Sequence, residues 1–138
     1  MRQATEVLQV RTGGPGLVEI TEAVSAWTRR QAMGTGLLTL FCRHTSASLL
    51  VQESADPDVL TDLAAFFEAI APEEGPYVHR TEGRDDMPAH IRTALTATQL
   101  AIPVTGSRLQ LGTWQGIFVF EHRQGRRRRE IVLHLIGE

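Results

Sequence analysis

The fold class is decided by the stretch IFVFEHRQGRRRREIVLHLI, which runs from Ile117 to Ile136. Its two apolar runs, Ile117–Glu121 and Ile131–Ile136, have the β-rich composition of strands, and Gln124-Gly125 between them predicts a hairpin turn. Strands that follow one another with short turns pair in antiparallel fashion. The stretch therefore favours an α+β domain over a doubly wound parallel sheet.

Upstream of this stretch, further segments have the composition or alternation of strands, and three have helical signals. Thr21 is expected to cap a first helix, and Asp56 with Pro57 begins a second, because Asp suits the cap position and Pro the first turn. A short third helix follows Pro88, after an irregular loop over 72–83. The predicted strands are 3–10, 37–43, 47–52, 100–104 and 108–111, and the buried stripe of the second helix is Leu60, Leu63, Phe67 and Ile70.

Length and composition indicate a single compact domain spanning 1–138. The chain of 138 residues is 42% hydrophobic and 22% charged, which is ordinary for globular proteins. No apolar run approaches the roughly twenty residues that cross a bilayer, and the first residues lack the apolar core of a signal peptide. The single Cys42 is expected to be a buried, unpaired thiol. We expect a cytoplasmic protein without a membrane partner.

The charged residues limit the kinds of ligand. All fourteen positive residues are arginine, so lysine chemistry such as Schiff-base formation is excluded. The formal net charge of −2 provides no basic field for a nucleic-acid backbone, so nucleic acid is not an expected partner. Phosphate groups would have to be recognised by arginine, backbone amides or a metal.

Three histidines occur where side chains of different segments can converge. His44 is at a strand end, His79 in a loop and His90 at a helix start. Three neutral imidazoles with one open position form a common catalytic zinc site, so these residues are candidate ligands of a divalent metal, zinc above all. The spacing matches no local metal motif, and three unrelated surface histidines are the alternative.

Carboxylates beside these histidines have competing roles. Asp56 is expected to be a helix cap rather than a catalytic group. Asp86 is either a cap or a carboxylate that orients a ligating histidine. Glu53 ends an apolar strand pattern and is a candidate base or supporting residue.

The arginine run at 126–129 is either a solvated face or a phosphate site. Strand alternation directs Arg127 and Arg129 to one side and Arg126 and Arg128 to the other, so at most half can line one pocket. Guanidinium groups contact phosphate through two parallel hydrogen bonds, which favours a phosphate-bearing ligand bound by Arg127 and Arg129. Trp114 is expected to fill the core at a tight turn.

The ordered set of polar motifs resembles one protein family. HTSAS (44–48), Tyr-x-His (77–79), DDMPAH (85–90) and LGTWQ (111–115), followed by Glu121, are similar to the YjbQ family, also called the secondary thiamine-phosphate synthase family. The resemblance implies an antiparallel two-sheet core with a few helices, assembled as a homotrimer. It also implies that the three histidines share a site and that Gln115, Glu121 and an Arg-x-Arg pair contribute to ligand binding or catalysis. Ser46 could either donate to a phosphate group or hold the backbone of a turn, and the sequence leaves both roles open.

The family label implies a transferase that joins a pyrimidine diphosphate to a thiazole phosphate and releases pyrophosphate. Two alternatives stay open. One is a metal-dependent hydrolase of phosphate-type substrates that uses Glu53 as base. The other is a non-catalytic trimer that binds a small anion.

Overall fold

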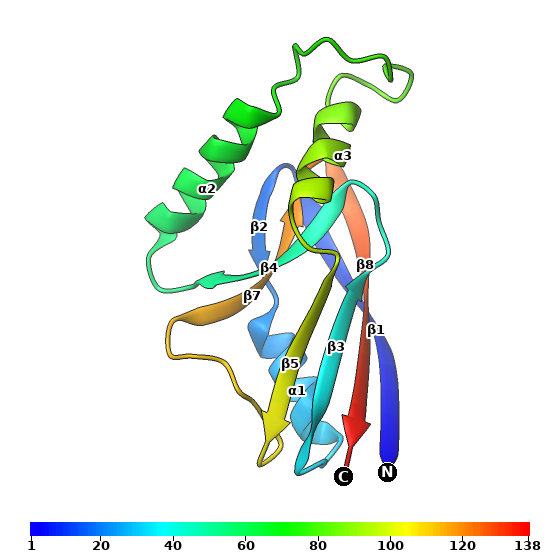
Figure 1. Ribbon diagram of the computed structural model, residues 1–138, viewed down its shortest axis with the longest axis vertical. Coiled ribbons are helices and arrows are strands. Elements are labelled where there is room, and N and C mark those ends of the chain that lie inside the picture. The colour runs from blue at the N-terminus through cyan, green and yellow to red at the C-terminus, as the bar shows by residue number, and fades with distance from the viewer.

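The computed structural model describes residues 1–138 as two antiparallel sheets and three helices, which confirms the expected α+β class (Figure 1). The larger sheet has the order β1 (Arg2–Gly13), β8 (Arg126–Gly137), β3 (Thr35–Cys42), β5 (Gln99–Thr105) and β6 (Arg108–Leu109). The smaller sheet has the order β2 (Gly16–Glu19), β7 (Gln115–Glu121) and β4 (Ala47–Glu53).

The hydrophobic core lies between the two sheets. Residues of β8 alternate between buried and half-buried from Arg129 onward, which is the period-two pattern of a strand with one face in the core. Helix α1 (Thr21–Arg30) adds Val24 and Trp27 to this core, and Cys42 is buried as expected. The two chain ends lie side by side (Figure 1) because β1 pairs with β8 from one end to the other.

The predicted hairpin between the last two strands is wrong in its pairing. Gly125 does form the turn and has a left-handed φ of 83°. However, β7 pairs with β2 and β4, whereas β8 pairs with β1 and β3, so the chain crosses from one sheet to the other at this turn. The arginine run therefore lies opposite the end of β1, where Arg11 faces Arg128 across the ladder.

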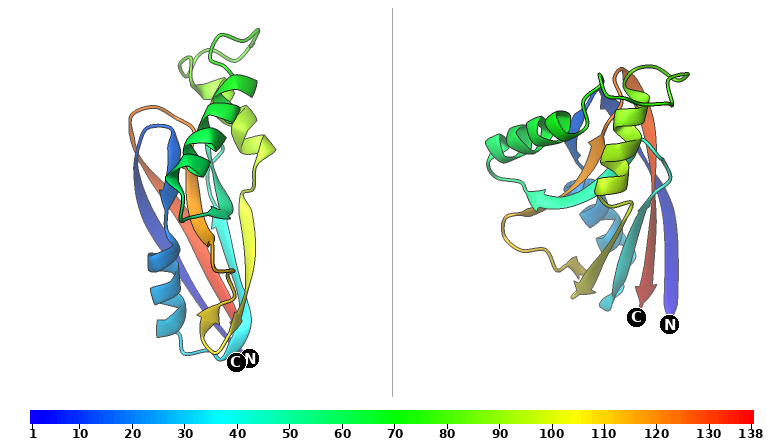
Figure 2. Two further views of the ribbon diagram at one scale, coloured as in Figure 1. Left: turned by 90° about the vertical axis from the view of Figure 1, so that its left-hand side faces the viewer. Right: turned by 45° about the horizontal axis from the view of Figure 1, so that its top comes forward.

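Helix α2 (Pro57–Ile70) begins as predicted, with the side chain of Asp56 accepting a hydrogen bond from the amide of Asp58 at 2.9 Å. Three residues of its predicted stripe, Leu60, Leu63 and Phe67, are half-buried, but no residue of the helix is fully buried, because the helix leans away from the sheets (Figures 1 and 2). Ile70 is 46% exposed. Trp114, expected in the core, is 63% exposed.

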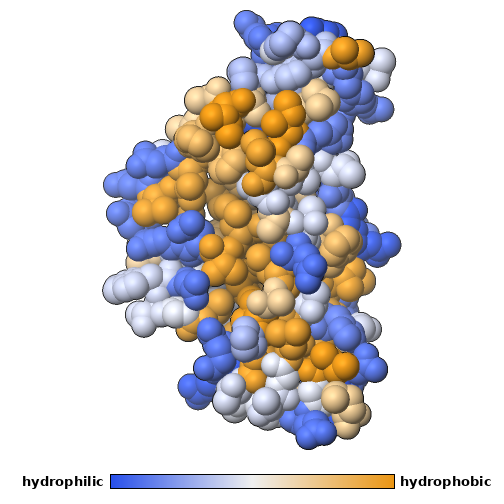
Figure 3. Space-filling model, viewed as in Figure 1, coloured by the Kyte–Doolittle hydropathy of each residue, from blue (hydrophilic) through white to orange (hydrophobic).

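Apolar residues gather in a broad region on the face of the molecule that carries α2, β5 and β3 (Figure 3). The large exposed apolar side chains of the chain include Leu37, Phe41, Phe66 and Leu95. A monomeric protein rarely exposes so much contiguous apolar surface, which marks this face as a candidate contact surface.

Helix α3 (Asp86–Leu95) begins two residues before Pro88, earlier than predicted, and follows the long loop after α2. The loop and the first turn of α3 lie at the end of the molecule opposite the chain termini (Figure 2). Thr21 is not a cap: its hydroxyl donates to Glu19 and accepts from the amide of Ile117. No helix has both the length and the apolar character needed to cross a membrane.

Candidate functional site

His79, Asp86 and His90 form a cluster in which one atom of each residue lies within 4.8 Å of the others. We refer to these three residues as the histidine–aspartate cluster. His90 follows Asp86 by one turn of α3, and the Nε2 atom of His90 lies 3.0 Å from Oδ2 of Asp86. The loop brings Nε2 of His79 to 2.7 Å from the same oxygen. Two predicted metal ligands are thus brought together, with a carboxylate as third member.

The backbone of Thr45 determines which nitrogen of His90 carries a proton. Nδ1 of His90 lies 2.8 Å from the carbonyl oxygen of Thr45, and a carbonyl can only accept a hydrogen bond. Nδ1 is therefore the protonated nitrogen, and Nε2 of the neutral ring has a lone pair directed at the carboxylate of Asp86. Two acceptors 3.0 Å apart need a cation between them, either an extra proton or a metal ion.

Arg123 holds the carboxylate of Asp86 from the other side. Its Nη1 donates to Oδ1 of Asp86 at 2.8 Å, and its Nε donates to Asp85 at 2.9 Å. Burial alone would raise the pKa of Asp86, but the hydrogen bond from His79 and the charge of Arg123 hold this pKa below its usual value. Asp86 is consequently an ionised, oriented carboxylate whose Oδ2 faces both histidines, an arrangement that could hold a divalent metal.

His44 lies outside the histidine–aspartate cluster. Its Nε2 accepts a hydrogen bond from the amide of Glu130 at 2.8 Å, so that nitrogen is not free to bind a metal within this chain. Burial, followed by the positive charge of Arg129, lowers the pKa of His44. His44 thus anchors the start of the HTSAS segment to β8.

Glu121 and Arg129 form a buried ion pair. Both Nε and Nη2 of Arg129 donate to the carboxylate of Glu121, and Thr12 donates to it as well. The amides of His122 and Arg123 donate to Oε2 of Glu121, each at 3.0 Å. Burial alone would raise the pKa of Glu121, but these bonds outweigh it and lower the pKa. Both carboxylate oxygens of Glu121 already accept hydrogen bonds from protein donors. The ion pair therefore stabilises the fold and does not offer a ligand site.

Ser46 and the arginines of the run differ in their exposure and in their hydrogen-bond partners. Nη2 of Arg129 donates to the hydroxyl and the carbonyl of Ser46, so both predicted anion contacts already have protein partners. As predicted, Arg127 lies on the same side of β8 as Arg129, and it donates to the carbonyl of Gln124 at 3.2 Å. Arg126 and Arg128 are exposed and line an open hollow with Arg11 and the half-buried Arg127, so the expectation that at most half of the run would line one pocket is wrong.

Glu53 and Gln115 lie together at the opposite end of the smaller sheet. They are cross-strand partners of β4 and β7, about six strand residues, or roughly 20 Å, from the end of β4 beside Thr45. Glu53 accepts the amide of Asp56 at 2.7 Å, and Gln115 accepts the amide of Gly112 at 2.8 Å. Both side chains stabilise local turns, and neither is brought to the histidine–aspartate cluster.

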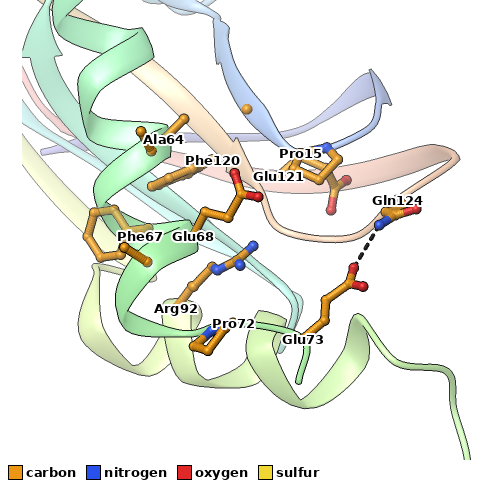
Figure 4. Close-up of a pocket in the computed structure, with 13 residues that line it drawn as sticks. Pro15, Ala64, Phe67, Glu68, Pro72, Glu73, Arg92, Phe120, Glu121 and Gln124 are labelled. Atoms are coloured by element: carbon orange, nitrogen blue, oxygen red, sulfur yellow. Dashed lines mark hydrogen bonds between the residues drawn. The ribbon is translucent and has the colours of Figure 1, made fainter. Parts of the chain in front are cut away.

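Three contributions at this end of the molecule were missed by sequence reasoning. The carbonyl of Thr45 has no sequence signal, since every residue has a carbonyl. Arg123 belongs to the arginine-rich segment but is separated from Asp86 by 37 positions. Arg92 lies on the buried side of α3, two residues after His90, and its side chain points into a cavity beside α2 (Figure 4).

Comparisons with known proteins agree with the fold and with the motifs. The model of the family described as UPF0047 protein YjbQ-like matches residues 6–138. UPF0047 protein sll1880 of Synechocystis sp. is 54% identical over 138 residues, which cover 99% of this chain and 94% of the relative. UPF0047 protein YjbQ of Escherichia coli O157:H7 is 41% identical over 136 residues, which cover 99% of this chain and 98% of the relative.

Solved structures support the same assignment. A protein of the YjbQ/UPF0047 family from Clostridium acetobutylicum superimposes with a TM-score of 0.88 and 30% identity, covering 95% of this chain and 99% of that chain. The conserved hypothetical protein TT1486 from Thermus thermophilus gives a TM-score of 0.84 and 37% identity over 95% of this chain and 99% of that chain. The chain therefore belongs to the YjbQ-like UPF0047 protein family.

Proposed function

We propose that this protein is an enzyme that binds a divalent metal at the histidine–aspartate cluster and acts on a small phosphate-bearing molecule. The observation that carries the proposal is the fixed tautomer of His90. Its Nδ1 is used by the carbonyl of Thr45, and its Nε2 lone pair faces the carboxylate of Asp86 at 3.0 Å. A metal ion accounts for this meeting of two acceptors without requiring a protonated ring.

Two imidazoles and one carboxylate are a ligand set of catalytic zinc sites, in which a further position is left open. His79 and Asp86 would complete the set begun by His90, with Arg123 and Thr45 fixing the orientation of the ligands. When bound, such a metal polarises a phosphoryl or carbonyl oxygen. The half-exposed position of His90 and the exposed position of His79 leave the cluster open to a substrate.

A hollow of about 350 Å³ beside the cluster suits a phosphate group. Arg80, Arg84 and His79 line it together with Glu73 and Glu74, so a bound phosphate would have to compete with two carboxylates for the guanidinium groups. Arg84 pairs with exposed Glu74, and Arg80 contacts the carbonyl of Gly75 at 3.4 Å, so both guanidinium groups can be recruited by a ligand at small cost. We assign phosphate recognition to these two residues rather than to Arg129, whose guanidinium is already paired with Glu121.

Two reactions fit this site. The transferase implied by the family label would condense a pyrimidine diphosphate with a thiazole phosphate, and the hydrolase would need only one substrate. The hydrolase loses its expected base, since Glu53 lies at the far end of β4. This placement favours the transferase, in which the departing pyrophosphate needs cationic stabilisation more than a strong base.

Metal analysis of the untagged protein tests the proposal. We expect one divalent ion per chain, loss of that ion in Asp86→Asn, and retention of it in the matched carboxylate control Glu53→Gln. The variant His44→Ala should also retain the metal, because His44 is engaged by the amide of Glu130. Absence of bound or bindable metal would reject the enzyme and favour the non-catalytic anion-binding protein.

Substrate assays then separate the two reactions. The metal-loaded transferase releases pyrophosphate only when both ring substrates are present, whereas a hydrolase releases phosphate from a single ester. Arg80→Gln with Arg84→Gln should weaken substrate binding by about tenfold or more, while Arg126→Gln with Arg128→Gln should change it little.

We further propose that the chain assembles as a homotrimer. The support is the uncovered apolar face in Figure 3, together with α2, which has no buried residue. A second copy covering Phe66 and Phe41, which are 57% and 48% exposed, would remove apolar surface from water. Sedimentation equilibrium should give three times the chain mass of 15.3 kDa, and a monomer at micromolar concentration would contradict the assembly.

A further inference from the structure

A cavity of about 740 Å³ lies between α2 and the end of β7, separate from the histidine–aspartate cluster (Figure 4). Its volume is in the range of small-molecule binding pockets. Phe67, Phe120 and Pro72 provide apolar wall, and the rings of Phe67 and Phe120 meet edge to face with centroids 5.3 Å apart. None of the cavity's lining residues belongs to the cluster proposed to bind metal.

Arg92 contributes a buried positive charge to this cavity. The residue is only 8% exposed, and its one protein partner is the carbonyl of Ala71, which accepts from Nη2 at 2.7 Å. Its Nε is buried and has no hydrogen-bond partner. In Figure 4 the guanidinium points into the cavity. A buried guanidinium without a counter-ion is costly, so an anionic group that completes its donors would be bound favourably.

The other charged side chains of the cavity are carboxylates, and they are not equivalent. Glu121 is already paired with Arg129. Glu73 accepts a hydrogen bond from the side chain of Gln124 at 2.7 Å. Glu68 is exposed and forms no salt bridge or hydrogen bond, so its carboxylate is free for a cationic group. The cavity thus combines one anion-binding residue, apolar wall and one cation-binding residue.

We propose that this cavity binds a small zwitterion with an apolar body, whose anionic group contacts Arg92 and whose ammonium group contacts Glu68. The apolar body lies against Phe67 and Phe120, where aromatic edges and faces favour a ring. A ligand with only a negative charge would meet repulsion from Glu68 and Glu73. A ligand with only a positive charge would leave Arg92 without its counter-ion.

Calorimetric titration with three related probes tests the three parts of this site. L-Phenylalanine has both charges and a ring, 3-phenylpropanoate lacks the ammonium group, and 2-phenylethylamine lacks the carboxylate. We expect L-phenylalanine to bind about tenfold or more tightly than either comparison compound, since each charge-assisted contact contributes about one order of magnitude. Equal affinity for all three probes, or no binding of L-phenylalanine at millimolar concentration, would overturn the proposal.

Matched variants locate the binding. Arg92→Gln should weaken L-phenylalanine and 3-phenylpropanoate by about tenfold and should not weaken 2-phenylethylamine. Glu68→Gln should weaken L-phenylalanine and 2-phenylethylamine by about tenfold and should not weaken 3-phenylpropanoate. Arg80→Gln, in the other hollow, should change none of them. L-Phenylalanine affinity that is unchanged in Arg92→Gln would overturn the assignment.

Ala64→Phe provides a test that keeps Arg92 in place. Ala64 lines the cavity, so a phenyl side chain there should fill the space and abolish L-phenylalanine binding while the protein stays folded. Binding equal to that of the parent protein would contradict the proposed location. Metal content distinguishes this site from the proposed metal centre: Asp86→Asn should keep L-phenylalanine binding, and Ala64→Phe should keep the metal.

Discussion

Two buried carboxylates, Asp86 and Glu121, each have an arginine partner and a lowered pKa, yet they differ in what their oxygens face. Glu121 is 0% exposed and receives donors from three side-chain atoms and two backbone amides. Asp86 is 4% exposed, and one of its oxygens faces the lone pair of His90. The number of donors around each carboxylate therefore distinguishes the two. Glu121 has enough donors and stabilises the fold, whereas Asp86 faces an acceptor and can bind a cation.

The largest expected effect comes from breaking the buried ion pair. Arg129→Met should lower the free energy of unfolding by about 3–5 kcal/mol, because it leaves the carboxylate of Glu121 buried without its counter-ion. Urea denaturation measures the loss. The double variant Glu121→Leu with Arg129→Met should recover a large part of it, since no unpaired charge remains.

Arg128→Gln is the matched control, because Arg128 lies next in the chain but is exposed. Its effect on the free energy of unfolding should stay within about 0.5 kcal/mol. If Arg129→Met lowers the free energy of unfolding by less than about 1 kcal/mol, the ion pair of Glu121 and Arg129 is not important for the stability of the fold.

The second expected effect is on metal affinity at Asp86, the other buried carboxylate. Arg123→Gln removes the guanidinium that donates to Asp86 and to neighbouring Asp85, but leaves all three candidate ligands in place. Metal affinity should fall by between about ten- and a hundredfold, as is typical when an outer partner of a ligand is removed. Competition against a chelating dye measures the change, and exposed Arg108→Gln serves as control. If the metal affinity does not change, Arg123 does not orient the ligands of the site.

A smaller effect per pH unit is expected from the pH dependence of stability. Burial, assisted by the charge of Arg92, lowers the pKa of His122 from 6.5 to about 3. The neutral ring lies 2.9 Å from the hydroxyl of Ser48. In the unfolded chain the ring takes up a proton near pH 6.5, so the stabilisation is complete above that pH and is lost progressively as the pH falls toward about 3.

The slope attributable to His122 should therefore be about 1.4 kcal/mol per pH unit within this window, with stability rising as pH rises. His122→Gln keeps a polar side chain near Ser48 and should remove this slope. Urea denaturation of both proteins at several pH values makes the comparison. Parallel curves for parent and variant would show that His122 does not titrate as described.

Much of the fold could be predicted because strand alternation and helix caps are local signals. The Asp56-Pro57 start of α2 and the apolar runs of β7 and β8 were recognised in this way. The pairing of β7 and β8 was not predictable, since a turn at Gly125 can either return a strand to its neighbour or direct it into another sheet. The exposure of Trp114 had no signal either, because nothing in a sequence shows which apolar face lacks a covering layer.

The candidate site was predictable to a similar degree. The spacing of Asp86 and His90 by four residues indicates one helix face, and His79 precedes them in a loop that can fold back. The engagement of His44 by a backbone amide and the role of the carbonyl of Thr45 arise from tertiary contacts of the main chain. Backbone groups are identical at nearly every position, so such contacts cannot be read from residue types.

The most direct test of the central claim is a zinc titration followed by the ¹⁵N NMR signals of the imidazole side chains. The account predicts one equivalent of zinc per chain, shifts at Nε2 of both His79 and His90, a proton retained on Nδ1 of His90, and little change at His44. Zinc that shifts neither ring, or a Nδ1 of His90 that carries no proton, would contradict the claim that the histidine–aspartate cluster is a metal centre.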